Sequence, residues 1–472
     1  RCIMLKNDLQ KGLFTVAVGV ILWFMPVPAG LKPQAWHMFA MFVATIVGFI
    51  LHPLPIGAIA FIACALSGFI KLIKPAEALS GFGNATIWLI VSAFLFAKGF
   101  VKTGLGKRIA YMIMEKLGDS SLKLAYTMAI TDLIVAPATP SNTARGGGIL
   151  FPIITSLCTA FGSTPDDQNR KKLGSFLMSS SFHVDCVTSS MFITSVAPNS
   201  LCVALAAQAC GIQISWGMWA LACAVPGLLS IIITPLLVYK LEPPEIKNTP
   251  EAPQIARAGL EEMGPVKKSE KVVFASFIIA LVLWATSSMT GLNATMIAMV
   301  CVGIMLVFGA IEWSDVTTEK AAWDTLVWMG GLMSLATALN KSGFVKWFAA
   351  QVGGMLGGMS WVTVLLILAV IYMYSHYGFA SLSAHVAAMY AAFLAVAVSA
   401  GAPAGLAAMT FASLTGIMGC LTHYATGPAP IYFGAGYLTQ AEWWKIGFVV
   451  SILYMICFVG IGPIWWSMIG LY

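Results

Sequence analysis

Charged residues are scarce in this chain of 472 residues, because Asp, Glu, Lys and Arg together make up only 10% of it. A soluble globular protein carries roughly 25% charged residues. Apolar residues make up 59%, more than the single core of a soluble protein would bury. The composition therefore excludes a soluble globular protein, a disordered chain and collagen. It indicates a chain whose excess apolar surface is covered by lipid.

Signatures of several other functions are missing. The ten cysteines include no C-x-x-C pair, and almost all lie within apolar stretches, unlike a disulfide framework or a zinc site. The sequence has no H-E-x-x-H motif and no G-x-x-x-x-G-K-[ST] phosphate-binding loop. We therefore expect no cofactor, no metal, no enzymatic activity and no ATP-driven transport. A rhomboid-like serine–histidine protease and an ion channel are the alternatives from other classes that the sequence leaves open.

Long apolar stretches dominate the chain, and a membrane-spanning helix needs about 20 such residues. Two stretches, 173–210 and 402–440, are too long for one crossing and contain Pro and Gly, so we expect each to be a broken helix. Two more, 122–160 and 360–398, are too short for two comfortable crossings, so we expect re-entrant hairpins. The predicted fold is an all-α polytopic membrane protein with two hairpins and about eleven transmembrane helices, near 12–29, 35–52, 54–73, 84–101, 173–210, 216–239, 272–290, 293–311, 323–340, 402–440 and 444–468.

The distribution of basic residues predicts the orientation. With the N-terminus in the cytoplasm, 19 Lys and Arg residues fall in inner segments and 5 in outer loops, as expected for membrane proteins. The C-terminus is then outside the cell. We expect the protein to lie in a bacterial cell membrane. The net charge of +7 follows from this topology, so no nucleic acid partner is needed. The first apolar stretch follows Lys6 and Lys11 but has no clear A-x-A site, so we expect a retained helix rather than a signal peptide.

The order of the predicted elements repeats in the two halves of the chain. Each half has full spans, a hairpin, a broken span and a final span, and five spans per half give the two copies opposite topology. The predicted division is an N-terminal helix, a first repeat, a polar cytoplasmic linker and a second repeat, at 1–34, 35–239, 240–271 and 272–472. Scaffold helices occupy 35–119, and the hairpins with their broken helices occupy 120–215 and 358–440. Inverted repeats with paired helix breaks indicate a secondary transporter with its site near the bilayer midplane, although chance similarity is the alternative.

Broken helices at membrane depth must line a polar cavity, and a helix start in that cavity favours an anion. Short polar side chains mark both hairpin tips, and Pro or Gly marks both breaks. A basic residue, Arg145 or His385, follows each tip, and a guanidinium suits a carboxylate. His423, just before the second break, is a further candidate for lining the site. The predicted substrate-binding residues are Ser141, Asn142, Thr143, Pro198, Asn199, Ser381, Ser383, Thr422, Gly427 and Pro428.

Each of these residues also has a structural interpretation. The tip residues Ser141 to Thr143 could cap a hairpin helix. Arg145 could pair with Asp132 instead of facing the substrate, and His385 could be a packing histidine. His183 and Asp185, two residues apart in the broken fifth span, do not share a helix face, and we expect a structural role for them.

Several strings of residues carry a family resemblance. Residues 137–148, Pro-Ala-Thr-Pro-Ser-Asn-Thr-Ala-Arg-Gly-Gly-Gly, resemble the divalent anion:sodium symporter superfamily. Residues 375–377, 384–386 and 421–431 look like its exchanger branch, which holds plastid 2-oxoglutarate/malate translocators and bacterial dicarboxylate and citrate:succinate antiporters. The resemblance covers essentially the whole chain. It implies a homodimer with a scaffold and a mobile elevator-like transport domain, and substrates such as malate, succinate, fumarate and 2-oxoglutarate.

The second tip departs from the pattern of the sodium-coupled members, which carry Ser-Asn-Thr at both tips. Here it reads Ser381-Leu382-Ser383, so the central amide is missing. Our hypothesis is that Arg145 and His385 replace the sodium ions as fixed cations. An empty carrier with attached charge crosses slowly, which predicts sodium-independent obligatory exchange of C4–C6 di- and tricarboxylates. The alternative is a sodium-coupled dicarboxylate symporter, and the preferred carboxylate is left open.

Overall fold

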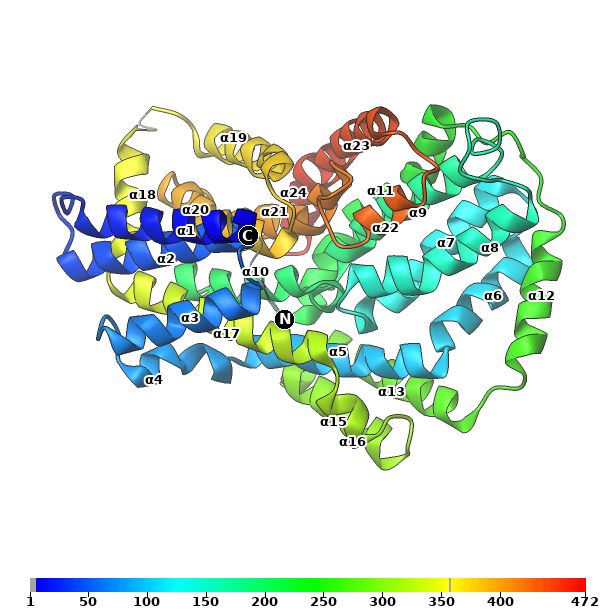
Figure 1. The fold of residues 1–472 in the computed structure, drawn as a ribbon, viewed down its shortest axis with the longest axis horizontal. Helices are drawn as coiled ribbons and strands as arrows, with labels where there is room; N and C mark the ends of the chain where they lie inside the picture. The colour runs from blue at the N-terminus through cyan, green and yellow to red at the C-terminus, as the bar shows by residue number, and fades with distance from the viewer. Residues whose placement is uncertain (1–5, 356–357) are drawn as a thin grey trace.

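The computed structural model describes residues 6–355 and 358–472, and Figure 1 shows their arrangement. The described residues form helices joined by turns and loops, and no β-strand occurs among them. The predicted all-α polytopic membrane fold is therefore confirmed. A single large core cluster runs through most of the helices, and a smaller one joins the start of the chain to residues 335–344.

The first half of the chain begins with α1 (Lys6–Phe24), which packs along α2. Short helical segments η1 (Ser80–Gly83), η2 (Ala136–Ala138) and η4 (Ile193–Ser195) interrupt the sequence of longer elements. The longer elements are α2 (Pro33–Leu51), α3 (Ile56–Phe69), α4 (Pro75–Ala78), α5 (Ala85–Thr103), α6 (Leu105–Leu117), α7 (Ser121–Val135), the π-helical η3 (Thr143–Leu150), α8 (Phe151–Ala160), α9 (Gly174–Met191), α10 (Ala197–Cys210) and α11 (Trp216–Leu241).

The second half repeats this order after α12 (Ala252–Met263), which lies in the linker. Its elements are α13 (Lys268–Ala285), α14 (Ser287–Thr290), α15 (Ala294–Val307), α16 (Trp313–Thr317), α17 (Lys320–Lys341), α18 (Phe344–Met355), α19 (Trp361–Tyr374), η5 (Ser375–Gly378), α20 (Leu382–Ser399), α21 (Ala404–Ile417), η6 (Met418–Cys420), α22 (Ala429–Gly434), α23 (Gln440–Met455), η7 (Ile456–Ile461) and α24 (Gly462–Met468). By position, α5, α7, α9 and α11 of the first half correspond to α17, α19, α21 and the α23–α24 segment of the second.

Helix lengths agree with a membrane protein. Six helical segments of the described chain are long and apolar enough to cross a bilayer: Pro33–Leu51, Ala85–Thr103, Trp216–Leu241, Trp361–Gly378, Leu382–Ser399 and Gln440–Met468. Three shorter apolar helices are Ile56–Phe69, Ala294–Val307 and Ala404–Cys420. Two of the six long segments are the arms of the second hairpin, so those arms are longer than the sequence analysis expected. The re-entrant insertion of the hairpins therefore stays a prediction.

The helices fall into two groups by their contacts. In one group, α17 packs against α3, α5 and α2, and α15 packs against α5 and α13. In the other group, α9 packs against α7, α11 and α21, and α20 packs against α10, α19 and α21. The groups meet where α10 contacts α5 and α17, and where α2 contacts α20. The predicted division into scaffold and hairpin-bearing segments stays a prediction.

The linker between the repeats is bound to the rest of the protein. Its helix α12 lies along α6, at the opposite end of the molecule from the α1–α2 pair (Figure 1). Gly259 permits this close approach, because a Cβ there would lie 2.5 Å from the ring of Tyr111. Before α12, the amide of Ser121 donates to the Lys247 carbonyl at 3.0 Å, and the amide of Glu245 donates to the Lys171 carbonyl at 3.0 Å. The linker thus touches α6, the start of α7 and the segment before α9.

Ion pairs join chain segments outside the apolar stretches. Arg170, just before α9, donates two hydrogen bonds to Glu442 of α23, at 2.8 and 3.0 Å. This pair joins the start of the first repeat's broken span to the start of the second repeat's final span.

Candidate functional site

The first hairpin tip lies between η2 and η3. Pro140 precedes the turn, and the Ser141 hydroxyl accepts a hydrogen bond from the amide of Ala144 at 3.2 Å. The side-chain amide of Asn142 donates to the Thr426 hydroxyl at 2.7 Å, with Asn142 7% exposed. The first tip is thereby held against the second helix break, 284 residues further along the chain.

The second hairpin tip has the same local geometry. Ser381 caps α20, and its hydroxyl accepts a hydrogen bond from the amide of Ala384 at 3.3 Å. Because Ser141 and Ala144 form the corresponding pair in the first tip, the two turns match at a shift of 240 residues. A serine that accepts from the amide three residues ahead is a standard helix N-cap. Both tips therefore begin a helix with its N-terminus at the turn.

The two helix breaks are built differently. At the first, the Asn199 side chain donates to the carbonyls of Ser189 and Phe192 at 2.7 and 2.8 Å, which holds the end of α9 against the start of α10. At the second, Gly427 is pressed against the first tip, since a Cβ there would overlap the Thr143 hydroxyl at 1.9 Å. A residue larger than glycine would push the second break away from the first tip.

Both tips and both breaks meet at one cavity of about 310 Å³. Six predicted substrate-binding residues line it: Ser141, Asn142, Pro198, Ser381, Ser383 and Gly427. The other lining residues are Phe94, Pro140, Val196, Ala197, Thr325, Trp328, Ala380, Leu382 and Thr426. None of these is charged, while hydroxyl and amide groups and the starts of η3, α10 and α20 surround the space. Such helix starts provide the positive ends of peptide dipoles.

Four predicted substrate-binding residues lie behind this wall or beside it. Thr143 packs on Gly427, and Asn199 is fully buried in the first break. Pro428 packs near Gly146, and the buried Thr422 hydroxyl has no hydrogen-bond partner. These positions support the wall of the cavity rather than line it. Their predicted contact with substrate stays a prediction.

His423 is directed elsewhere. Its Nδ1 accepts a hydrogen bond from the indole of Trp444 at 3.1 Å, and its ring packs on Phe433 with centroids 4.5 Å apart. It does not belong to the residues that line the cavity. Packing between α22 and α23 accounts for its position.

Arg145, one of the two predicted fixed cations, lies behind the first tip, and its role in replacing sodium stays a prediction. Arg145 is 1% exposed and does not line the cavity. Its Nε donates to Asp132 at 2.9 Å and its Nη2 to Asp185 at 3.1 Å. Its Nη1 donates to the carbonyls of Thr139 and Ser195 at 2.9 and 2.6 Å. A buried guanidinium needs counter-charges and acceptors, and two carboxylates from α7 and α9 provide them.

His385 is also fully buried, and it belongs to a chain of hydrogen bonds behind the second tip. His376 Nε2 donates to the Ala425 carbonyl at 2.9 Å, so the Nδ1 of a neutral His376 accepts from His385 Nδ1 at 3.1 Å. His385 Nε2 then lies 3.1 Å from the Ser375 hydroxyl, which can either donate to it or accept from it. The arrangement thus satisfies a neutral or a charged His385. The ring also stacks on Tyr372 and Phe379 with centroids 4.6 Å away.

Sequence reasoning missed several residues that line the cavity. Thr325 and Trp328 come from α17 and Phe94 comes from α5, which are corresponding helices of the two repeats. The repeat itself was the available signal, because corresponding helices of an inverted pair approach a midplane site from opposite sides. The pairing of Arg145 with Asp132 was the structural alternative named from the sequence, whereas Asp185 as a second partner was missed, although it is the acidic residue inside the apolar stretch of the first broken helix.

A second cavity, of about 290 Å³, lies between the two groups of helices. Its lining comes from α2, α10, α17, α18 and α20 and is almost entirely apolar, with Gln208 and Asn340 as the polar exceptions. A dicarboxylate would lose its hydration there without gaining hydrogen bonds. The cavity at the hairpin tips therefore suits a small organic anion better.

Comparison with known proteins identifies the family of the chain. A family model described as the sodium:sulfate symporter transmembrane region matches residues 6–472. The chain belongs to this family, within the divalent anion:sodium symporter superfamily. It is 49% identical over 460 residues to the putative malate transporter YflS of Bacillus subtilis, covering 98% of this chain and 96% of that protein. It is 42% identical over 462 residues to the chloroplastic dicarboxylate transporter 1 of Spinacia oleracea, covering 98% and 81%.

Solved structures share the fold at low sequence identity. The YdaH transporter of Alcanivorax borkumensis matches with a TM-score of 0.59 at 12% identity, covering 98% of this chain and 97% of that one. MtrF of Neisseria gonorrhoeae matches with a TM-score of 0.57 at 10% identity, covering 98% and 96%. These likenesses support the polytopic helical fold. Family membership confirms a multi-pass membrane transporter, and the relatives' names support dicarboxylates as the transported class.

Proposed function

We propose that this protein exchanges C4–C6 di- and tricarboxylates across the membrane without sodium. The observation that carries the proposal is the cavity at which both hairpin tips and both breaks meet. It offers the hydroxyls of Ser141, Ser381 and Ser383 and the amide of Asn142, and no negatively charged side chain lines it. At about 310 Å³ it lies at the lower end of the range for small-molecule sites.

The polar groups suit two carboxylates on one substrate. The tips come from opposite halves of the chain, so each can bind one end of a short diacid such as malate, succinate, fumarate or 2-oxoglutarate. Helix starts at the tips offer N–H donors to an anion. Two close relatives carry names that refer to malate and dicarboxylate transport, which supports the same class of substrate.

The exchange mode follows from where the positive potential originates. It comes from groups that are part of the chain, namely the helix starts, to which a protonated His385 would add. In this proposal Arg145 acts behind the tip by neutralising Asp132, not by touching substrate. The second tip has the buried Leu382 where an amide would help to hold sodium. An empty carrier therefore keeps its positive potential, whereas a sodium-coupled carrier releases its ions.

The size of the effect makes exchange obligatory. One uncompensated charge at membrane depth costs roughly 3 kcal/mol on insertion scales. That cost slows the return of the empty carrier roughly 150-fold. A bound dicarboxylate offsets the positive potential, so the loaded carrier moves in both directions while the empty one does not.

The proposal includes an elevator mechanism in a homodimer. The group of helices that carries the hairpins would move along the group formed by α2, α3, α5, α13, α15 and α17. The contact groups and the family resemblance support this division. We place the N-terminus in the cytoplasm and the C-terminus outside, on the distribution of Lys and Arg.

Proteoliposomes test the proposal directly. Vesicles with or without internal malate are assayed for uptake of labelled malate in choline and in sodium buffer. We expect uptake only into malate-loaded vesicles, at equal rates in the two buffers. Strong sodium-dependent uptake into empty vesicles would refute the exchange mode. A panel of succinate, fumarate, 2-oxoglutarate and citrate inside the vesicles would rank the substrates.

A sodium-coupled dicarboxylate symporter is the second candidate. The observation that favours it is the intact Ser141-Asn142-Thr143 string at the first tip, which matches the pattern of the sodium-coupled members. The sodium and choline arms of the same experiment separate the two candidates. Binding of one sodium at the first tip alone would give partial sodium dependence with continued exchange.

A further inference from the structure

The three buried charged residues behind the first tip do not balance. Asp132 of α7, Arg145 of η3 and Asp185 of α9 are each 1% exposed or less. Two ionised carboxylates around one guanidinium leave one net negative charge away from water. Such a charge is strongly unfavourable, and buried groups commonly avoid it by binding a proton or a cation.

The two carboxyl groups have different surroundings. Both oxygens of Asp132 accept hydrogen bonds, Oδ1 from Arg145 Nε at 2.9 Å and Oδ2 from the Thr188 hydroxyl. Only one oxygen of Asp185 does so, from Arg145 Nη2 at 3.1 Å. Asp185 Oδ2 is buried and has no hydrogen-bond partner. An ionised carboxylate with a bare buried oxygen is the costlier of the two.

The charged and titratable groups that face this cluster offer no second cation. Asp132 faces it from α7, Arg145 from η3 and Cys186 from α9. Tyr432 faces it from α22, with its hydroxyl donating to the Gly146 carbonyl at 3.0 Å, and Cys420 lies beside Cys186. His183 on α9 is turned to the Ser179 carbonyl at 2.7 Å and packs near Trp443. The described residues also include no group of three or more side chains suited to hold a metal ion.

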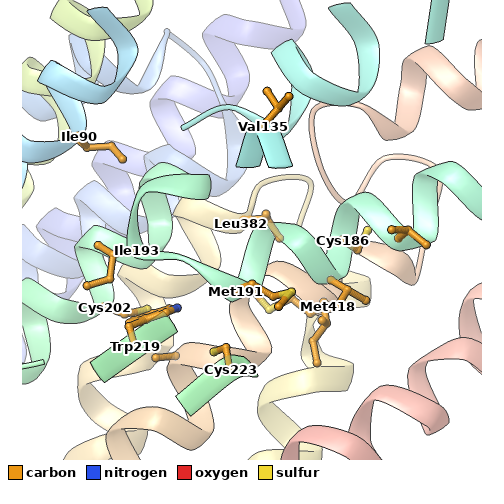
Figure 2. Packing of buried hydrophobic residues seen from close by; sticks show 14 of the residues in the cluster. Ile90, Val135, Cys186, Met191, Ile193, Cys202, Trp219, Cys223, Leu382 and Met418 are labelled. Atoms are coloured by element: carbon orange, nitrogen blue, oxygen red, sulfur yellow. The ribbon is translucent and has the colours of Figure 1, made fainter. Parts of the chain in front are cut away.

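Polar and apolar side chains both surround the cluster, and Arg145 Nη2 also donates to the Ser189 hydroxyl at 2.8 Å. Val135 ends α7, and Cys186 and Met191 lie on α9, close to Met418 and to Leu382 of the second tip (Figure 2). The three side chains of the cluster are almost inaccessible to solvent, so bulk water offsets little of the surplus charge. The missing charge must be supplied by a ligand small enough to fit against Asp185.

We propose that the cluster binds one proton, carried by Asp185, so that Asp132, Arg145 and Asp185 together are neutral. Asp132 is the ionised partner, because both of its oxygens already accept hydrogen bonds. The proton is a bound ligand of the protein that the sequence motifs do not reveal.

This proton bears on the anion site. Asp185 Oδ2 lies 3.5 Å from where a Gly146 Cβ would be, and Pro428 packs on the same position at 3.5 Å. Gly427, the neighbour of Pro428, lines the cavity. Ionised Asp185 would therefore place a negative charge close behind the wall that faces a dianion. The proton removes that repulsion whether the protein works by exchange or by symport.

Infrared spectroscopy of the purified full-length protein tests the proposal without any transport assay. A protonated carboxylic acid has a C=O stretch distinct from that of a carboxylate, and it shifts in heavy water. We expect this band in the wild type at neutral pH, in detergent free of carboxyl groups. Asp185→Asn should remove the band while shifting the thermal unfolding midpoint by only a few degrees, because the amide keeps the cluster neutral.

Two further variants keep the result decisive. Asp132→Asn should also remove the band, because the single remaining carboxyl then ionises opposite Arg145, so either variant suffices if the other fails to fold. Glu442→Gln, in an ion pair far from the cluster in sequence, should retain the band. A wild type without the band would overturn the proposal. So would a band that survives in folded Asp185→Asn protein.

A sodium arm distinguishes a proton from a metal cation. If the band is absent and sodium chloride, but not choline chloride, raises the unfolding midpoint of the wild type and not of Asp185→Asn, then sodium occupies the site and the proton assignment is wrong. Failure of malate exchange in proteoliposomes would refute the proposed function and leave the infrared result intact.

Discussion

The two hairpin tips share a backbone design and differ in the chemistry behind it. At each tip a serine caps the next helix, Ser141 with the amide of Ala144 and Ser381 with that of Ala384. One turn further, Arg145 is surrounded by two carboxyls and two carbonyls from other segments, whereas His385 is satisfied by neutral hydrogen bonds and stacked rings. The repeat therefore fixes geometry without fixing charge.

The two tips also differ in how many other chain segments they are bonded to. The guanidinium of Arg145 draws in side chains from α7 and α9 and the Ser195 carbonyl of η4, so the first hairpin and the first broken helix are held as one unit. His385 is tied mainly to its own hairpin, through Ser375 and His376. A change at the first tip should consequently spread further than the same change at the second.

The largest expected effect comes from Arg145→Gln. It leaves the carboxyls of Asp132 and Asp185 facing each other without a cation, and removing one partner of a buried ion pair typically costs about 3–5 kcal/mol. We expect a large fall in the thermal unfolding midpoint and loss of malate exchange. The matched control is Arg257→Gln, because Arg257 donates to Glu115 at 3.0 Å with a side chain 69% exposed. Exposed pairs contribute less than about 1 kcal/mol, so equal effects of the two variants would contradict the comparison.

A smaller effect is expected at the corresponding position of the second tip. His385→Gln removes the imidazole ring that stacks on Tyr372 and Phe379, and it leaves His376 Nδ1 without its partner. It creates no unpaired buried charge. We expect destabilisation of about 1–3 kcal/mol, as for a lost buried hydrogen bond. The unfolding midpoints of His385→Gln and Arg145→Gln, measured side by side, give the ranking. A larger loss at position 385 would show that the histidine chain, not the charged cluster, is the more sensitive support.

An effect of similar size is expected at Thr426, near the second break. Thr426→Val removes the acceptor of the Asn142 amide, a bond of 2.7 Å that joins the tip of one repeat to the break of the other. Leaving a buried donor unsatisfied costs about 1–3 kcal/mol, which corresponds to roughly a tenfold or greater loss of malate affinity if the tip loses its position. Thr127→Val is the matched control, because the buried Thr127 hydroxyl of α7 has no partner to lose and Thr127 is not a predicted substrate-binding residue. Malate-dependent thermal shifts of the two variants should therefore differ, and identical shifts would argue against the link between the tips.

The sequence was sufficient for the order of the elements because apolar runs and their Pro or Gly interruptions report directly on burial in lipid. The hairpin tips could be located for the same reason, since Ser141 and Ser381 are polar residues next to turns inside apolar stretches. The boundaries were less accurate. The stretch 54–73 contains a helix only over Ile56–Phe69, and Lys71 adopts φ 59° just beyond it.

Other features depended on contacts that a linear pattern does not contain. The helices α6 and α18 were not expected as separate elements, because their apolar residues recur along one face instead of forming a long run. The partners of Arg145 come from positions 13 and 40 residues away, on two different helices. Thr325 and Trp328 reach the cavity only because α17 folds back against α5. Charge balance was the one signal in the sequence that pointed to Asp132 and Asp185.

In the proposed elevator mechanism, the docked linker would limit the movement of the hairpin-bearing helices. Its backbone is hydrogen-bonded to Ser121 at the start of the first hairpin and to Lys171 before α9, while α12 rests on α6. If those helices moved relative to α6, the linker would either lose these hydrogen bonds or move with the helices. A cross-link between the linker and α6 would therefore block this movement, and a shorter linker would reduce its distance.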